Sequence, residues 1–268
     1  MKIALIQFQS HQDLDGNLKR MEDIFVKAAD TGAELVVFPE MAYFTAPTEQ
    51  AIATTKHFDE TLQKFSNWAK TKKCALVPGT LREPARSGKY FNTLPFIDNS
   101  GKVLAKYRKL FLFRATLPHK TYEENKHCEA GGEPVVVDFK GWKIGLSICF
   151  DIRFPELFRK LKKQGAEAVL LPAAFTVPTG QAHWEVLTRA RAIENQFFFL
   201  ASAMCGKMGD NASTYGHSVA VSPWGEIMGG LKDSEGVLTI ELAKEALAQA
   251  RARVDAIGCM REDLLWQL

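Results

Sequence analysis

The sequence predicts an α/β protein with two related sheets. Short apolar runs rich in β-branched residues alternate along the chain with segments of helical periodicity, which is typical of this fold class. The chain also repeats itself. Gly32–Pro39 (GAELVVFP) is echoed by Gly165–Pro172 (GAEAVLLP), and Lys2–Leu5 by Lys143–Leu146. Any two β-α-β units share such an order, so that simpler explanation stays open, but the matched stretches favour two sheets related by an internal pseudo-two-fold axis.

The expected elements follow from local periodicity. Apolar, β-branched runs predict strands at Lys2–Phe8, Leu35–Phe38, Ala75–Pro78, Leu94–Ile97, Pro134–Phe139, Lys143–Cys149, Ala168–Leu171, Phe197–Ala203, His217–Val221 and Gly236–Leu242. Amphipathic segments predict helices at roughly Gly16–Thr31, Phe58–Lys72, Pro155–Gln164, Gln181–Asn195 and Lys244–Ala252. Leu35–Phe38 is apolar without alternation, which predicts a strand covered on both faces.

Length and composition set broad limits on function. A chain of 268 residues without a linker rich in Gly, Ser or Pro predicts a single domain over residues 1–268. The net charge of +3 and the lack of a basic motif argue against nucleic acid as a partner. No apolar run approaches the ~20 residues that a bilayer span needs, so no membrane is expected. Five widely spaced cysteines without a CxxC pair indicate reduced thiols and a cytoplasmic location.

Cys149 stands where a predicted strand runs into the helix that is expected to begin at Pro155. Ligands of open α/β sheets bind at the carboxyl ends of the strands. At such a position the N–H of Phe150 would be free to face the carbonyl oxygen of a bound molecule. Considered alone, a cysteine in an apolar run is more commonly a small buried hydrophobic residue, and the remaining cysteines are interpreted in that way.

Two charged residues occupy positions that favour burial. Glu40 directly follows the apolar strand Leu35–Phe38, where partial removal from water suits a general base; a helix cap or a surface acid is the alternative. Lys109 is followed by the apolar stretch Leu110–Phe113. A buried ammonium group needs acidic partners, for which Glu40 and Glu124 are the candidates. A lysine whose head group reaches solvent from a strand end is the alternative.

Three stretches together resemble the signature motifs of the nitrilase, or carbon–nitrogen hydrolase, superfamily. They are Phe38-Pro39-Glu40, Tyr107-Arg108-Lys109-Leu110 and Ser147–Glu156 (SICFDIRFPE), and they occur in the order and at a spacing similar to those of the family. The likeness extends over nearly the whole chain, from the first strand to Pro223–Glu226. The resemblance implies a four-layer α-β-β-α sandwich with two stacked mixed sheets. It also implies association through the helical faces, as a homodimer or a higher homo-oligomer.

The same resemblance implies roles for individual residues. Cys149 would be the nucleophile and Glu40 the general base. Lys109 would stabilise the tetrahedral intermediate, and Glu124 would be a second, positioning carboxylate. The segment between Lys109 and Glu124 is slightly shorter than in the family, so Glu123 stays open as the alternative to Glu124. No metal ion or organic cofactor is expected.

The substrate is expected to be a small amide that carries carboxylates. Ala173–Asn195 resembles the branch that contains deaminated glutathione amidase, and the neighbouring ω-amidase branch, which acts on α-ketoglutaramate, is the alternative. Both branches hydrolyse a primary amide on a short keto-acid chain to an acid and ammonia. Such a substrate needs a cation, for which Arg153 is the candidate, although a structural or interface ion pair would also explain it. Phe150, Ala174 and Phe175 are the other expected substrate contacts.

Other classes of function are open as well. A cysteine–histidine hydrolase or transferase would use His119, His183 or His217 as its base, yet none of these stands in a recognisable motif with Cys149. An acyltransferase of the same fold would pass a thioester to an amine in place of water. A non-catalytic binding protein of the same fold is disfavoured, because all three signature residues are present.

Overall fold

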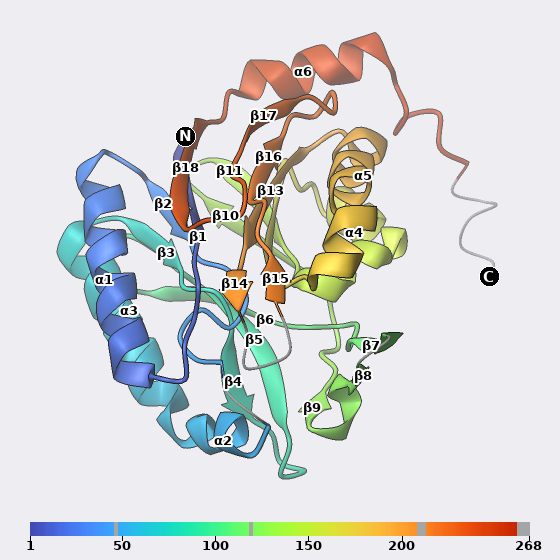
Figure 1. Cartoon of the computed structure of the whole chain (residues 1–268). Coiled ribbons are helices and arrows are strands. Elements are labelled where there is room, and N and C mark those ends of the chain that lie inside the picture. The colour runs from blue at the N-terminus through green and yellow to red at the C-terminus, as the bar shows by residue number, and fades with distance from the viewer. Residues whose placement is uncertain (46–47, 118–119, 208–212, 262–268) are drawn as a thin grey trace.

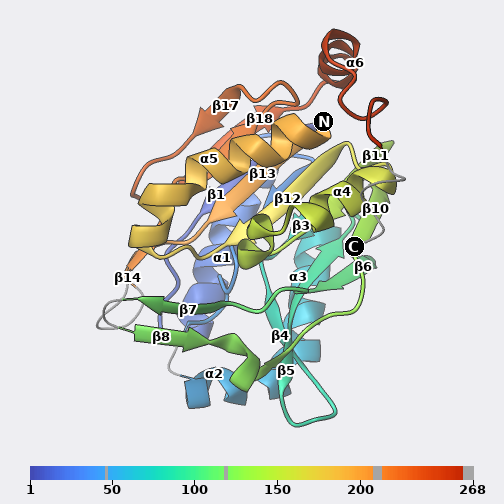
Figure 2. The ribbon, with the colours of Figure 1, turned by 90° about the vertical axis from the view of Figure 1, so that its right-hand side faces the viewer.

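Two sheets lie face to face between two layers of helices (Figure 1). The computed structural model describes residues 1–45, 48–117, 120–207 and 213–261. His119 and residues 262–268 of the predicted domain lie outside these ranges. Helices α1 (Leu14–Asp30) and α3 (Phe58–Lys72) cover the outer face of one sheet, and α4 (Pro155–Lys163) and α5 (Val177–Asn195) cover the other, as Figure 2 also shows. The expected four-layer α-β-β-α sandwich is therefore confirmed.

The first sheet is mixed and has the order β18-β1-β2-β3-β5-β4, with β6 and β9 also paired to β5. Its strands are β1 (Lys2–Gln7), β2 (Leu35–Val37), β3 (Ala75–Val77), β4 (Leu81–Pro84), β5 (Tyr90–Ile97), β6 (Val103–Arg108), β9 (Cys128–Glu129) and β18 (Gly236–Glu241). The second sheet has the order β10-β11-β12-β13-β16-β17. Its strands are β10 (Val135–Phe139), β11 (Trp142–Leu146), β12 (Ala168–Ala173), β13 (Phe198–Ala203), β16 (Val219–Val221) and β17 (Ile227–Gly230).

Smaller elements lie around this sandwich. Two hairpins are formed by β7 (Arg114–Leu117) with β8 (Lys120–Glu123), and by β14 (Cys205–Lys207) with β15 (Ser213–Tyr215). The short helices are α2 (Thr48–Ala53) and the 3-10 turns η1 (Thr54–His57), η2 (Glu124–Lys126) and η3 (Cys149–Arg153), and α6 (Lys244–Arg253) follows β18. Within the described ranges, no helix is both long enough and apolar enough to cross a membrane.

The sequence repeat corresponds to a repeat in the spatial order and direction of the strands. In each sheet an antiparallel edge strand is followed by three parallel strands and then by two antiparallel ones. The echoed strands also share one register, because Ile3 pairs with Leu35 in the first sheet and Ile144 pairs with Ala168 in the second. The parallel centres β1-β2-β3 and β11-β12-β13 are therefore equivalent, as the repeat predicts, whereas the outer strands of the two sheets come from different places in the chain order.

The glutamate of each Gly-Ala-Glu stretch explains why this stretch recurs. The Glu34 N–H donates to the Lys2 carbonyl at 2.8 Å, and its carboxylate accepts the Lys2 N–H at 2.9 Å. Glu167 makes the same two bonds with Lys143, at 2.8 and 3.0 Å. Each glutamate thus satisfies backbone groups at the start of a parallel strand pair, where a lost hydrogen bond would be costly.

The core consists of two apolar clusters, one on each face of the first sheet. Successive residues of a strand point alternately into one cluster and the other. Leu35 and Val37 face the cluster that includes the space between the sheets, whereas Val36 faces the cluster under α1 and α3. All three side chains are fully buried, so the prediction of a strand covered on both faces is confirmed. Ser202 on β13 joins the two sheets directly, because its hydroxyl lies 2.5 Å from the Ile6 carbonyl and 3.0 Å from the Val37 carbonyl.

One predicted boundary is wrong where it matters for function. The strand expected at Lys143–Cys149 ends at Leu146, and Cys149 instead begins the 3-10 turn η3. The physical reason is the Asp151 carboxylate, which accepts the Ile148 N–H at 2.9 Å and so takes it away from the strand ladder. The helix expected from Pro155 does begin there.

Candidate functional site

Three predicted site residues follow the ends of three strands. Glu40 comes shortly after β2, Lys109 directly after β6, and Cys149 shortly after β11. Glu40 is 3% exposed and Lys109 2%, so both charges are almost completely removed from water. Charges at this depth are tolerated only when they are paired and hydrogen-bonded. The local sequence explains the position of Glu40, which follows the fully buried strand β2, whereas β6 before Lys109 is mostly half-buried or exposed and Lys109 is buried by its tertiary contacts.

Glu40 is held from both sheets at once. Its Oε1 accepts the Lys109 ammonium at 3.0 Å and the Asn92 side-chain amide at 2.9 Å, both from the first sheet. Its Oε2 accepts the backbone N–H of Ala174 at 3.1 Å, just after β12 of the second sheet. Ala174, which sequence analysis placed in the substrate pocket, therefore orients the predicted base through its backbone.

Glu124 completes the charge cluster around Lys109. The ammonium donates to both oxygens of Glu124, at 3.0 and 3.3 Å. The same carboxylate accepts the Phe113 N–H at 2.7 Å and the Asn92 amide at 3.3 Å. Glu123 points elsewhere and pairs with Lys126. Of the two alternatives left open by the sequence, the geometry brings Glu124 to Lys109.

Electrostatics fix the resting protonation of this cluster. Burial works against the charge of Lys109, but the carboxylates of Glu124 and Glu40 outweigh it and hold the lysine pKa well above its ordinary value. Burial raises the pKa of the Cys149 thiol well above its usual range, and the charge of Glu40 and a hydrogen bond with its side chain add to this effect. The ammonium of Lys109 opposes that rise. The cluster therefore rests with a charged lysine and a neutral thiol.

The backbone at Cys149 adopts an unusual conformation. Its φ of +44° lies in the left-handed region, which costs a residue with a side chain on the order of 1–3 kcal/mol. The turn is closed by Asp151, whose N–H donates to the Ile148 carbonyl at 2.9 Å while its carboxylate accepts the Ile148 N–H. The N–H of Phe150 has no hydrogen-bond partner within the described parts of the chain. A strained turn that presents a thiol next to a free donor suits a nucleophile and its oxyanion site.

Aromatic rings and one arginine lie beside this turn. The guanidinium of Arg153 sits 5.8 Å from the Phe150 ring centroid and 5.4 Å from that of Phe175. It forms no ion pair with any carboxylate in the described ranges; its nearest polar partner is His183 Nδ1, at 3.4 Å. Burial lowers the pKa of Arg153 somewhat, as expected for a cation without a counter-ion. The alternative of an intramolecular ion pair is thus not observed in the described chain.

Sequence reasoning assigned no role to several residues of the cluster. Asn92 lies in the middle of β5 and donates to both Glu40 and Glu124. Its local signal was a pair of polar side chains, Asn92 and Thr93, in an otherwise apolar run. Tyr107 and Asp151 are buried and bonded to each other at 2.7 Å, and both stand inside the motifs around Lys109 and Cys149. Their places two residues from Lys109 and from Cys149 were the sequence signal that could have identified them.

Neither His183 nor His217, the two candidate histidines within the described residues, is placed to act as the base for Cys149. His183 is exposed and lies against Arg153, and the ring of His217 hydrogen-bonds the Tyr215 carbonyl at 2.7 Å. His119, the third histidine considered, lies outside the described residues. The geometry therefore favours Glu40 over a described histidine as the group that can take the proton of Cys149.

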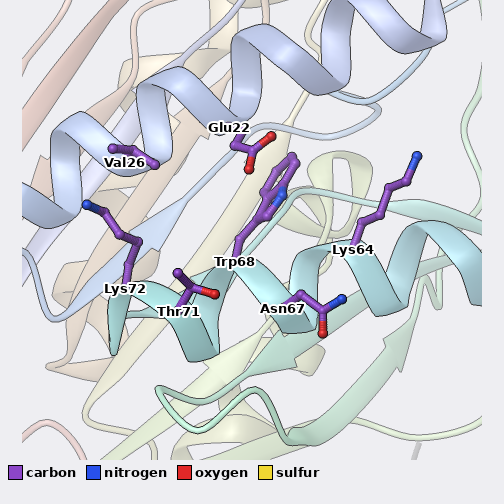
Figure 3. A pocket seen from close by; sticks show the side chains of 7 residues that line it. All are labelled: Glu22, Val26, Lys64, Asn67, Trp68, Thr71 and Lys72. Carbon is purple, nitrogen blue, oxygen red and sulfur yellow. The ribbon is translucent and has the colours of Figure 1, made fainter.

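The outer surface also carries hollows away from this cluster. One, of about 330 Å³, is a groove between α1 and α3 where Glu22 and Val26 face Trp68 (Figure 3). Another, of about 480 Å³, is lined by Lys106 and Arg108 together with residues 132, 133 and 135. Neither is lined by a predicted site residue. In the part of the chain that the structure describes, no group of three or more His, Cys, Asp or Glu side chains could hold a metal ion.

Comparison with known proteins shows the family of the chain. Residues 2–252 match the family model described as Carbon-nitrogen hydrolase. The deaminated glutathione amidase of Synechocystis sp. (strain PCC 6803 / GT-S) is 36% identical over 263 residues, which cover 95% of this chain and 96% of that protein. The omega-amidase of Mus musculus is 33% identical over 98% of this chain and 96% of its own. A mutant amidase from Nesterenkonia sp. AN1 with acrylamide added to its active-site cysteine has a TM-score of 0.82 at 29% identity, covering 94% of this chain and 97% of its own.

Proposed function

The chain belongs to the carbon–nitrogen hydrolase family, and on that premise we propose that it is an amidase whose catalytic triad is Glu40, Lys109 and Cys149. One observation carries the proposal. A buried carboxylate and a buried ammonium group lie 3.0 Å apart, and their charges shift the pKa of the Cys149 thiol, which stands in a strained turn, in opposite directions. Strongly perturbed ionisable groups that meet at strand ends are typical of active sites.

The first half of the reaction forms a thioester. Glu40 takes the thiol proton as the sulfur of Cys149 attacks the amide carbon, because a thiol with so high a pKa does not ionise in advance. The oxygen that becomes negative is held by the Lys109 ammonium and the Phe150 N–H, each typically worth about 3 kcal/mol in the transition state. The protonated Glu40 then gives its proton to the nitrogen, the carbon–nitrogen bond breaks, and ammonia leaves.

The second half returns the enzyme to its resting state. Glu40 removes a proton from a water molecule, which attacks the thioester carbon while Lys109 and Phe150 again hold the oxygen. The carbon–sulfur bond breaks, the acid product leaves, and the proton returns to Cys149. Glu124 keeps Lys109 charged and oriented throughout, since its carboxylate binds the ammonium but receives no proton from the substrate.

The proposed substrate is a small amide with a carboxylate at some distance from the reacting carbon. Arg153 supports this, because its guanidinium lies beside the thiol turn without a carboxylate partner in the described chain. The rings of Phe150 and Phe175 flank it and lower the cost of its partial burial through cation–π contact. Deaminated glutathione is the first candidate, and α-ketoglutaramate is the second.

The test is ammonia release from a panel of five compounds. The panel consists of deaminated glutathione, α-ketoglutaramate, an N-carbamoyl amino acid, a simple aliphatic amide and a nitrile. Wild type and Cys149→Ala are compared on each. We expect release that needs Cys149 and favours deaminated glutathione by tenfold or more; a preference for α-ketoglutaramate would keep the mechanism and assign the ω-amidase substrate. Activity above a few per cent in Cys149→Ala, or no release by folded wild type, would overturn the proposal.

Arg153→Met tests the substrate class separately from the chemistry. We expect KM to rise at least tenfold for the carboxylate-bearing amides and to change less than twofold for the aliphatic amide. Arg20→Met is the matched control, since Arg20 also lies over a phenylalanine ring, that of Phe8 at 4.5 Å, but outside the charge cluster. Equal effects of Arg153→Met on charged and neutral amides would remove Arg153 from the pocket.

We also propose that two copies of the chain associate through the face formed by α5 and the turn after β16. Val186 and Ile193 on α5 and the neighbouring Trp224 are exposed apolar side chains. The turn is held against the helix, because Arg189 donates to the Gly225 carbonyl at 3.0 Å. Exposed apolar side chains gathered on one face are typical of protein interfaces. Light scattering should show a dimer that Val186→Lys dissociates; a monomeric wild type would contradict this.

A further inference from the structure

Asp151 is a fully buried carboxylate that the proposed mechanism does not use. It accepts three hydrogen bonds, from the Tyr107 hydroxyl at 2.7 Å, the Phe111 N–H at 3.0 Å and the Ile148 N–H at 2.9 Å. Two of these donors flank Lys109 in the sequence, and the third directly precedes Cys149. One side chain thus connects the segment that carries the ammonium group to the turn that carries the thiol.

The backbone hydrogen bonds of Lys109 run within its own sheet, and its side chain reaches the second sheet indirectly, through Glu40, which accepts the Ala174 N–H. The Lys109 backbone N–H donates to the Asn92 carbonyl at 2.9 Å, and its carbonyl accepts the Gly131 N–H at 2.8 Å. These bonds hold Lys109 against β5 of the first sheet. Cys149, in contrast, follows β11 of the second sheet. The reacting groups therefore come from different layers, and Asp151 bridges them beside the reacting atoms.

From this arrangement we propose that Asp151 and Tyr107 are positioning residues, which set the Lys109 ammonium relative to the Cys149 thiol by hydrogen bonds across the two layers. The inference rests on the proposed triad. A carboxylate suits the task because its two oxygens accept all three donors, whereas the single oxygen of an amide cannot. Asp151 also closes the turn that holds Cys149 in its left-handed conformation, so both partners of the oxyanion step depend on it.

Tyr107→Phe is the sharpest test, because it removes one hydroxyl and keeps the buried ring. A displacement of about 1 Å at reacting groups can cost about a hundredfold in rate. We expect kcat to fall at least tenfold, with KM within twofold of wild type, on whichever of deaminated glutathione and α-ketoglutaramate the wild type prefers. We expect a larger loss of kcat, about a hundredfold, for Asp151→Asn, again without a matching change in KM.

Tyr43→Phe is the matched control for loss of a buried tyrosine hydroxyl. The Tyr43 hydroxyl is buried and bonds Thr54 at 3.0 Å and Arg82 at 3.1 Å, outside the charge cluster. Urea unfolding of both variants compares their stability. We expect Tyr43→Phe to lose stability to a similar extent but to keep kcat within twofold of wild type.

The outcomes separate this inference from the function on which it rests. If ammonia release needs Cys149 but Tyr107→Phe keeps its kcat, or loses no more than Tyr43→Phe, the positioning role is refuted and the triad stands. If wild type releases no ammonia, or Cys149→Ala is as active as wild type, the triad fails and the positioning role fails with it. Should Asp151→Asn not fold, Tyr107→Phe alone decides the question.

Discussion

Replacing Lys109 with methionine should destabilise the protein strongly, and more at pH 8 than at pH 5. Methionine keeps the length and apolar stem of the lysine but removes the charge that compensates Glu40 and Glu124. Charges about 4 Å apart attract by about 4 kcal/mol at an effective dielectric constant of about 20, so the two pairs together exceed the several kcal/mol that burying the ammonium costs. Removing one partner of a buried pair typically costs about 3–5 kcal/mol, which we expect at pH 8.

The pH dependence follows from the protonation of Lys109 in wild type and of the carboxylates in the variant. In wild type the pKa of Lys109 is raised, so the charged lysine makes its full contribution to the free energy of unfolding below about pH 10. That contribution is lost only as pH rises through the higher pKa of the folded state. The variant leaves carboxylates without a cation, and protons neutralise them as pH falls. The deficit should therefore shrink by about 1–2 kcal/mol between pH 8 and pH 5, since each unit of pH difference is worth about 1.4 kcal/mol per group.

Urea unfolding followed by tryptophan fluorescence and circular dichroism measures this deficit. Lys106→Met is the matched control, because Lys106 lies on β6, three residues before Lys109, but is exposed, and it should change stability by only about 0.5 kcal/mol. Adding Glu40→Gln to Lys109→Met should recover about 2 kcal/mol in a double-mutant cycle. A deficit below 1 kcal/mol at pH 8, or the same deficit at both pH values, would refute the charge compensation on which the site is built.

Two further predictions concern the backbone near Glu40 and the titration of Asp151. In Gly79→Ala, the new methyl group would meet the Pro39 carbonyl oxygen at 1.9 Å, at a residue with left-handed backbone. Thermal unfolding should therefore show a loss of stability of about 3 kcal/mol, and ammonia release should fall at least tenfold. The control Gly88→Ala is equally left-handed but has open space around it, so it should lose only about 1 kcal/mol of stability and no activity. Burial raises the pKa of Asp151 to about 6 against the opposing hydrogen bond from Tyr107, so the folded state holds this proton more tightly than the unfolded state does. The contribution of Asp151 to stability should therefore grow by about 3 kcal/mol as pH falls from about 6 to about 4, and this gain should vanish in Asp151→Asn. Urea unfolding of both proteins over this pH range measures the gain, and parallel pH profiles of the two proteins would contradict the prediction.

The parts of the fold that the sequence predicts are those governed by local pattern. The helix Phe58–Lys72 has the predicted bounds because its apolar spacing and flanking residues are local signals. Leu35–Val37 is covered on both faces as its unbroken apolar run indicates. The strands β6, β7 and β9 were missed, since their mixed polar sequences lack the unbroken apolar run that marks β2.

The parts of the site that the sequence does not predict depend on register between distant strands. Asn92 reaches the charge cluster because β5 pairs with β6 so that the Lys109 N–H meets the Asn92 carbonyl, a long-range match that no local pattern encodes. The Ala174 N–H reaches Glu40 only because the two sheets stack with these strand ends together. Glu40 after a buried strand and Lys109 before an apolar stretch could be identified singly, but their partners required the stacked arrangement.

The attachment of Glu40 to both sheets links activity to the mechanical integrity of the sandwich. A slip of one layer past the other by about an ångström would stretch either the contact with Lys109 or the contact with Ala174, while leaving every helix and strand intact. Heat or denaturant should therefore abolish turnover before it changes the far-ultraviolet circular dichroism. Efforts to make the enzyme work at higher temperature should accordingly strengthen the seam between the sheets, where Ser202 already joins them, in preference to the outer helices.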